Sequence, residues 1–108
     1  MSHHLAQVQS VIQQSLAHQI NEFLTGDEGL VTVNFVEVQP DLKAAIVWII
    51  FERPENSQRV IQALNNHRRI FQKHLANTYN FKYTPVLTFK IDEAQTSQDS
   101  IEKLFGRM

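Results

Sequence analysis

The chain has 108 residues, 43% of them hydrophobic, with a formal net charge of −1, 3 Gly, 3 Pro and no Cys. This composition indicates one domain with a hydrophobic core, and the lack of cysteine excludes disulfides, a thiolate nucleophile and a thiolate metal site. No apolar run approaches the ~20 residues of a membrane helix, and the N-terminus lacks the apolar block of a secretion signal. We therefore expect residues 1–108 to form a single domain of a soluble, cytoplasmic protein, with a cysteine-free secreted domain as the alternative.

The first predicted element is an amphipathic helix. Apolar residues recur at three- and four-residue spacing, which places them on one face; they are Leu5, Val8, Ile12, Leu16, Ile20 and Phe23. The opposite face is mostly Gln, Ser and Asn and carries hardly any charge. Gly26 is predicted to end the helix, and residues 26–29 to form a turn or loop.

Two strands are predicted next. Leu30 to Val38 alternates, which places Val31, Val33 and Phe35 on one face. Residues 44–51 are almost wholly apolar, a pattern typical of a strand that is covered on both faces or lies at a sheet centre. The Pro40-Asp41 turn between the two strands favours an antiparallel hairpin.

A helical region is predicted from Pro54 to about Tyr79, because it contains neither Gly nor a further Pro. Its apolar stripe is interrupted by His67, and the weak helix formers Asn65 and Asn66 precede it. The pattern favours a break or kink there, and one long helix is the competing interpretation. The stripe consists of Val60, Leu64, Phe71 and Leu75.

Pro85 is predicted to end the helical region, and Val86 to Ile91 to form a third strand. Residues 93–108 are predicted to be a loosely ordered tail, in which Ile101, Leu104 and Phe105 have the spacing of one last helical turn or two. The order is α-β-β-α-(kink)-α-β. It predicts an α+β fold with a three-stranded sheet and the helices packed on one face.

Basic and acidic residues are segregated along the chain. Between Glu55 and Asp92 there is no acidic residue, so that stretch carries +6 while the rest of the chain carries −7. A field of one sign on part of a small domain favours a polyanionic partner, of which nucleic acid is the commonest. A solvated helix face is the alternative interpretation.

Two segments resemble the ribosome-binding factor A family. Residues 36–49, Val-Glu-Val-Gln-Pro-Asp-Leu-Lys-Ala-Ala-Ile-Val-Trp-Ile, are similar to its hairpin, in which a Val-Glu-Val strand end precedes Asp-Leu, an Ala and a Val-aromatic strand. The second segment is Ala63-Leu64 followed, twenty-one residues after Leu64, by residues 85–89 (Pro-Val-Leu-Thr-Phe) and then Asp92. Both have the family's spacing without gaps, and neither motif is catalytic.

The resemblance implies a type II KH-like domain that binds the immature small (30S) ribosomal subunit and promotes processing and maturation of 16S rRNA. It implies that the protein is a monomer off the ribosome. The subunit and its 16S rRNA would be the partners, with no cofactor, membrane or small-molecule substrate. The alternative function is a KH-like module that binds other proteins and not ribosomes.

The chain departs from the family at the kink between the two helices. The family has Ala-x-Gly there, whereas this chain has His67-Arg68-Arg69, and Gln72 stands where an arginine often follows. Glycine eases a sharp bend. The departure therefore predicts either a kink that holds a residue at a strained φ, or two helices that run straighter.

A basic stripe is the candidate RNA-binding surface. On a helix, steps of three and four residues align Arg59, Gln62, Asn66, Arg69 and Lys73 on one stripe. Arg68 faces the same groove as Arg69 only if the helix bends. Guanidinium and ammonium groups bind phosphate, which gives affinity for an RNA backbone without reading its sequence. The predicted RNA-binding residues are Arg59, His67, Arg68, Arg69, Lys73 and Lys82.

Metal and catalytic sites are not expected. His67 and His74 are seven residues apart, which is further than the four-residue spacing that lets two rings share a metal. His67 is expected instead to lie at the kink or to contact phosphate. No nucleophile with a base, phosphate loop or pair of carboxylates is present, so the chain is not expected to be an enzyme.

Three further positions have competing interpretations. Trp48 is expected in the core rather than as a base-stacking platform. Asp41 is expected to bond nearby backbone rather than to act as a catalytic acid. An exposed aromatic beside Lys82 would be able to stack on a base, although Phe81 is expected in the core; the aromatics there are Tyr79, Phe81 and Tyr83.

Overall fold

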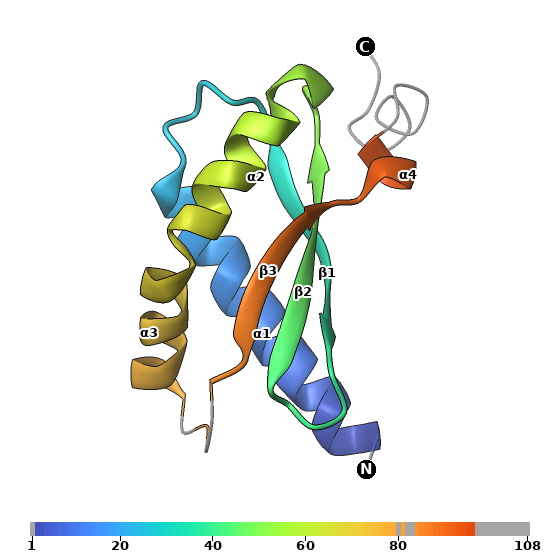
Figure 1. The fold of residues 1–108 in the computed structure, drawn as a ribbon, viewed down its shortest axis with the longest axis vertical. Coiled ribbons are helices and arrows are strands. Elements are labelled where there is room, and N and C mark those ends of the chain that lie inside the picture. The colour runs from blue at the N-terminus through green and yellow to red at the C-terminus, as the bar shows by residue number, and fades with distance from the viewer. Residues whose placement is uncertain (1, 80, 82–83, 97–108) are drawn as a thin grey trace.

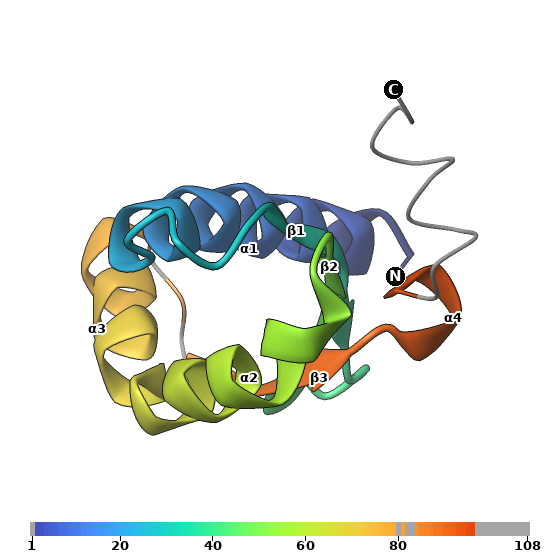
Figure 2. The ribbon, with the colours of Figure 1, turned by 90° about the horizontal axis from the view of Figure 1, so that it is seen from above.

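The computed structural model describes residues 2–79, 81 and 84–96. Of the four α-helices in this part of the chain, three lie on one side of a sheet and a short fourth lies on the other (Figures 1 and 2). The prediction of an α+β fold with one three-stranded sheet is confirmed. The elements are α1 (Ser2–Phe23), β1 (Val31–Val38), β2 (Ala44–Phe51), the 3-10 turn η1 (Pro54–Asn56), α2 (Ser57–Asn66), α3 (Arg68–Thr78), β3 (Val86–Ile91) and α4 (Glu93–Thr96).

The sheet has the strand order β1-β2-β3. β1 pairs antiparallel with β2, as the hairpin turn predicts, and β3 pairs parallel with β2 on its other side. A parallel pair needs a long crossover, which α2 and α3 supply. The apolar strand is therefore the central one, with Ala45, Val47 and Ile49 buried against the helices.

The predicted face of β1 is wrong in one residue. The register shifts between Val33 and Phe35, so Asn34 is an extra residue that forms a β-bulge. Val33, Val36 and Val38 are buried, whereas Phe35 is 43% exposed on the outer face. Simple alternation assumes a period of two residues, and one inserted residue turns every later side chain to the opposite face.

The predicted break lies at His67, between α2 and α3. The backbone of His67 has φ −99° and ψ 6°, and its N–H is shared between the carbonyls of Ala63 and Leu64, each at 3.1 Å. These angles belong to the bridge region, which does not require glycine. The expectation of a strained φ or straighter helices is therefore wrong, because the helices bend at a residue with an ordinary negative φ.

The core lies between the sheet and α1–α3. The apolar stripe of α1 faces it as predicted, with Ile12 and Leu16 fully buried and Ile20 1% exposed. The apolar stripes of α2 and α3 pack on the same face of the sheet and complete the core through Val60, Leu64, Phe71 and Leu75.

Glutamine side chains from α1 close the free edge of β1. Gln9 Oε1 accepts a hydrogen bond from the Val38 N–H at 3.1 Å, and Gln13 Nε2 donates to the Asn34 carbonyl at 3.2 Å. An unpaired strand edge is a template for aggregation unless its backbone groups are satisfied. Two glutamines of the nearly uncharged face of α1 therefore have a structural role.

The free edge of β3 is closed in the same way by α2 and α3. The Asn65 carboxamide pairs with the backbone of Phe89 in both directions, accepting from its N–H at 2.9 Å and donating to its carbonyl at 3.1 Å. Gln72 Oε1 accepts from the Leu87 N–H at 3.0 Å, and Arg68 Nη1 donates to the Leu87 carbonyl at 3.3 Å. Side chains from both sides of the bend thus provide hydrogen-bond partners for the backbone groups at the free edge of β3.

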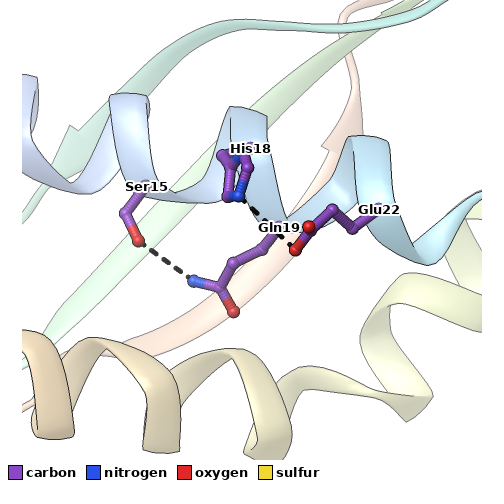
Figure 3. Close-up of polar contacts among 4 residues, drawn as sticks. All are labelled: Ser15, His18, Gln19 and Glu22. Carbon is purple, nitrogen blue, oxygen red and sulfur yellow. Dashed lines mark hydrogen bonds and ion pairs between the residues drawn. The ribbon is translucent and has the colours of Figure 1, made fainter.

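Two further contacts lie along α1 (Figure 3). Gln19 Nε2 donates to the hydroxyl of Ser15, which is 9% exposed, at 3.1 Å. His18 Nε2 and Glu22 Oε1 lie 3.5 Å apart one turn on, with side chains 70% and 69% exposed. An exposed pair of this kind stabilises a protein by less than about 1 kcal/mol, so it has no large effect on the fold.

The hairpin turn confirms the interpretation of Asp41. Its Oδ1 accepts a hydrogen bond from the Lys43 N–H at 3.0 Å, which is a side-chain bond to nearby backbone. Leu42 between them has φ 63°, in the left-handed region that favours glycine. The turn is also held by the Leu42 N–H, which donates to the Gln39 carbonyl at 2.8 Å.

Glu28 is a buried carboxylate that organises the loop after α1. Its two oxygens accept hydrogen bonds from the backbone N–H and hydroxyl of Thr25 and from the N–H of Gly26. Burial raises the pKa of the Glu28 carboxyl, but hydrogen bonds from the backbone and from Thr25 outweigh it, so the net pKa is lowered. The charged form therefore stabilises the fold.

We expect Glu28→Gln to destabilise the protein at pH 7 by about 1–3 kcal/mol, because an amide cannot accept all of these bonds as a carboxylate does. The folded-state pKa lies below the unfolded value, so this stabilisation is present above that value and is lost as pH falls through the folded pKa. Urea unfolding between pH 3 and 7 measures the difference. Asp27→Asn, at an exposed neighbour, is the control, and a constant gap between wild type and E28Q across this range would contradict the account.

Some expectations fall outside the described residues. Lys82 and Tyr83 do so, as do Ile101, Leu104 and Phe105. Of the predicted tail at 93–108, the structure describes the one-turn helix α4, and the loose order of the remainder stays a prediction. No helix in the described part of the chain combines the length and the apolar character needed to cross a membrane.

Candidate RNA-binding surface

The outer sides of α2 and α3 form the candidate surface. Arg59 on α2 and Arg69 and Lys73 on α3 are exposed. Figure 2 shows α2 and α3 on the opposite side of the sheet from α4. We call this the α2–α3 surface and define it by the polar residues that the sequence aligns, Arg59, Gln62, Asn66, Arg69 and Lys73. All five are accessible to solvent.

The bend at His67 changes how these residues are grouped. Arg69 and Lys73 are four residues apart on α3, which places them on one face. Arg59 lies on α2, before the bend, so the stripe is not continuous but consists of two shorter stripes that meet at an angle. Within residues 2–79, 81 and 84–96, no carboxylate pairs with Arg59, Arg69 or Lys73. The three charges are free to bind phosphate.

An exposed apolar residue follows Arg69 of this surface in the sequence. Ile70, directly after Arg69, is 57% exposed. It stands one residue before Phe71, which is buried, so it does not belong to the apolar stripe of α3. The position of Ile70 outside the apolar stripe is the sequence signal from which its exposure could have been predicted. If the neighbouring cations bind phosphate as predicted, this side chain offers contact to a sugar or base.

Arg68 has a different environment from Arg69. It is half-buried and points to the sheet, where Nη1 donates to the Leu87 carbonyl at 3.3 Å and Nε donates to the Asn65 carbonyl at 3.0 Å. The bend therefore does not place the side chains of Arg68 and Arg69 on the same face. Its interactions are those of a residue that holds α3 on β3, and its role in RNA binding stays a prediction.

His67 lies in an aromatic cluster at the bend. Its ring centroid is 4.5 Å from that of Phe23 and 5.1 Å from that of Phe71, and the residue is half-buried. This location agrees with the interpretation of His67 as a kink residue. Its contact with phosphate stays a prediction.

The basic stretch is divided in space. Lys90 belongs to it in sequence but extends from β3 on the outer face of the sheet, where Nζ lies 6.0 Å from the centre of the Trp48 ring. Trp48 is half-buried and outside the core cluster, so the expectation that it belongs to the core is wrong. Tyr79 and Phe81, with centroids 5.9 Å apart, pack against the core.

Metal sites and pockets were the other candidate sites considered among the described residues. No group of three or more His, Cys, Asp or Glu side chains that could hold a metal occurs among them. One open pocket of about 450 Å³ lies at the end of α1 and beside the start of β1, lined among others by Leu24, Leu30 and Glu52. None of the residues of the α2–α3 surface lines it.

A family model described as Ribosome-binding factor A matches residues 4–105. The ribosome-binding factor A of Rhodopseudomonas palustris (strain HaA2) is 39% identical over 75 residues, which are 69% of this chain and 56% of that protein. This chain therefore spans little more than half the length of that curated relative.

Solved structures agree with the fold. The crystal structure of ribosome-binding factor A from Thermus thermophilus matches with a TM-score of 0.70 at 23% identity, covering 80% of this chain and 93% of that one. A homology model of the Thermus thermophilus factor, fitted into a cryo-EM map of its complex with the 30S subunit, matches with a TM-score of 0.68 at 22% identity, covering 82% and 94%. At these identities the likeness concerns the fold alone. Because the family model spans nearly the whole sequence, the chain belongs to the ribosome-binding factor A family.

Proposed function

We propose that this protein is an assembly factor that binds the immature 30S ribosomal subunit and promotes processing and maturation of 16S rRNA. Membership of the ribosome-binding factor A family is the observation that carries the proposal. A relative of the same fold, from Thermus thermophilus, is described in complex with the 30S subunit. The proposal includes a KH-like RNA-binding mode, a cytoplasmic location, a monomeric state off the ribosome and no catalysis.

The mechanism we infer is electrostatic and steric. Arg69 and Lys73 bind phosphates from α3, Arg59 adds a charge from α2, and Ile70, next to Arg69, contacts a sugar or base. Contacts of this kind hold one arrangement of an RNA without reading its sequence. The bend at His67 supports this use of the surface, because two stripes at an angle fit a curved backbone better than one straight stripe does.

Co-sedimentation tests the proposal. We expect the purified protein to pellet with immature small subunits at low salt, more weakly with mature small subunits, and not with large subunits. Equal retention on small and large subunits would indicate non-specific binding to RNA and would contradict the proposal. The absence of retention on every subunit would contradict it as well and would favour a module that binds other proteins.

A further inference from the structure

The outer face of the sheet carries an aromatic pair that no described helix covers. Phe35 and Trp48 lie on adjacent strands with ring centroids 6.1 Å apart and planes inclined by 24°. Phe35 is 43% exposed and Trp48 is half-buried. The bulge at Asn34 places Phe35 on this face. The rings form a nearly continuous apolar surface on the side of the sheet opposite to α1–α3.

The charges around this pair do not favour a nucleic acid. Trp48 Nε1 donates a hydrogen bond to Glu37 Oε1 at 3.1 Å, and Lys90 Nζ lies 6.0 Å from the Trp48 ring centre. One acid and one base flank the rings, so the local charge is balanced. Single-stranded nucleic acids are bound by stacking together with a positively charged groove, whereas an apolar peptide segment needs no net charge.

The chain itself crosses to this face after β3. Asp92 is fixed at the crossing, because its N–H donates to the Ile49 carbonyl at 2.8 Å and its Oδ2 accepts from Asn34 Nδ2 at 2.7 Å. Asp92 Oδ1 also accepts from the Gln95 N–H at 3.3 Å, at the start of α4. α4 then packs against β2 on the outer side of the sheet (Figure 2).

Ile50, on the outer side of β2, is already shielded from solvent. It is only 5% exposed but does not belong to the core cluster on the helix side. Trp48 lies two residues before Ile50 on the same face, a separation of about 7 Å along the strand. Apolar side chains thus continue along the outer side of β2 from Ile50 to the aromatic pair.

The segment that follows α4 has the composition to continue this cover. Ile101, Leu104 and Phe105, which lie outside the described residues, have the spacing that places apolar side chains on one helical face. The five residue steps from Thr96 to Ile101 span up to about 17 Å when extended, which is about five residues along a strand that α4 already contacts. We propose that residues 97–108 dock on the Phe35–Trp48 pair and bury it. The outer sheet face is then an internal docking site, and the α2–α3 surface is the face left for RNA.

Trp48 is the single tryptophan of the chain, so its fluorescence reports on this site. We expect wild type to show blue-shifted emission and weak quenching by acrylamide. Leu104→Ser combined with Phe105→Ser should shift the emission to the red and increase the quenching constant. The matched control is Glu102→Ser with Lys103→Ser, which changes the two preceding residues to serine and should leave both quantities unchanged. Circular dichroism establishes that all three proteins are folded.

Three outcomes would overturn the proposal. One is wild-type emission and quenching equal to those of the L104S/F105S protein. Another is shielding of Trp48 that appears only as protein concentration rises, since this would identify a second copy as the occupant. The third is a single-stranded RNA oligonucleotide that quenches Trp48 equally in wild type and L104S/F105S, which would identify the pair as an open stacking platform. None of these outcomes depends on ribosome binding, so failure here is distinguishable from failure of the proposed function.

Discussion

Reversing two charges on α3 is expected to remove most of the affinity for the small subunit. Arg69→Glu combined with Lys73→Glu replaces two exposed cations that no described carboxylate neutralises. Hydrogen bonds to charged groups contribute about 1.5–3 kcal/mol each, so losing two phosphate contacts weakens binding by roughly a hundredfold or more. The log–log salt slope should fall by about 1.4 units, because each contact on a single strand contributes about 0.7. Dissociation constants of labelled protein for isolated subunits, measured at several salt concentrations, provide both quantities.

The matched control changes the net charge by the same amount as R69E/K73E, but at positions outside the α2–α3 surface. Lys43→Glu with Lys90→Glu changes two exposed lysines that lie outside the α2–α3 surface, on the hairpin turn and on the outer sheet face. We expect this variant to bind nearly as wild type does. Similar losses in the two variants would show that net charge alone governs binding, and normal binding by the R69E/K73E protein would refute the assigned surface. Arg68 is not used in this test, because its hydrogen bonds to the carbonyls of Asn65 on α2 and Leu87 on β3 give it a role in stability.

Asn65→Ala is expected to have the largest effect on stability among the polar substitutions considered. The asparagine makes two hydrogen bonds to the Phe89 backbone, and its removal leaves the N–H and carbonyl of Phe89, a residue 1% exposed, without that partner. Each polar group left unsatisfied in such a place costs about 1–3 kcal/mol. We expect a loss of about 2–4 kcal/mol in the free energy of unfolding, or a fall in Tm of roughly 10–20 °C. Thermal and urea unfolding followed by circular dichroism measure it.

Asn66→Ala is the control, since Asn66 has the same chemistry one residue later and is exposed. Alanine is the better helix former, so this variant should be within about 0.5 kcal/mol of wild type. Equal effects of the two substitutions would contradict a special role for Asn65. The edge of β3 that Asn65 closes would be open in the N65A protein. We therefore also expect it to aggregate sooner on heating than the N66A protein does.

The element order was predictable because each element has its own local pattern. The spacing on α1, the apolar run of β2 and the Pro before β3 each indicate one structure. The break at His67 was predictable for a similar reason, since a histidine interrupts an apolar stripe beside two weak helix formers. The position of Phe35 on the outer face of the sheet was not predictable, because nothing in residues 31–38 distinguishes a bulged strand from a regular one.

The environment of the basic residues was only partly predictable. Charge and helical spacing correctly indicate that Arg59, Arg69 and Lys73 are exposed. The position of Arg68 depends on how α3 sits against β3, which is a long-range contact without a local signal. The same applies to Asn65, whose amide finds its partner twenty-four residues away. The absence of glycine at the bend has a physical explanation, because the angles at His67 are accessible to any L residue.

The salt dependence of binding to immature small subunits tests the central claim most directly. For wild type we expect retention in co-sedimentation at low salt that declines steadily as salt rises. The log–log slope should be about −2 or steeper, as three phosphate contacts from Arg59, Arg69 and Lys73 require. Retention that does not change with salt would contradict the account, because it would indicate an interface that does not depend on these charges.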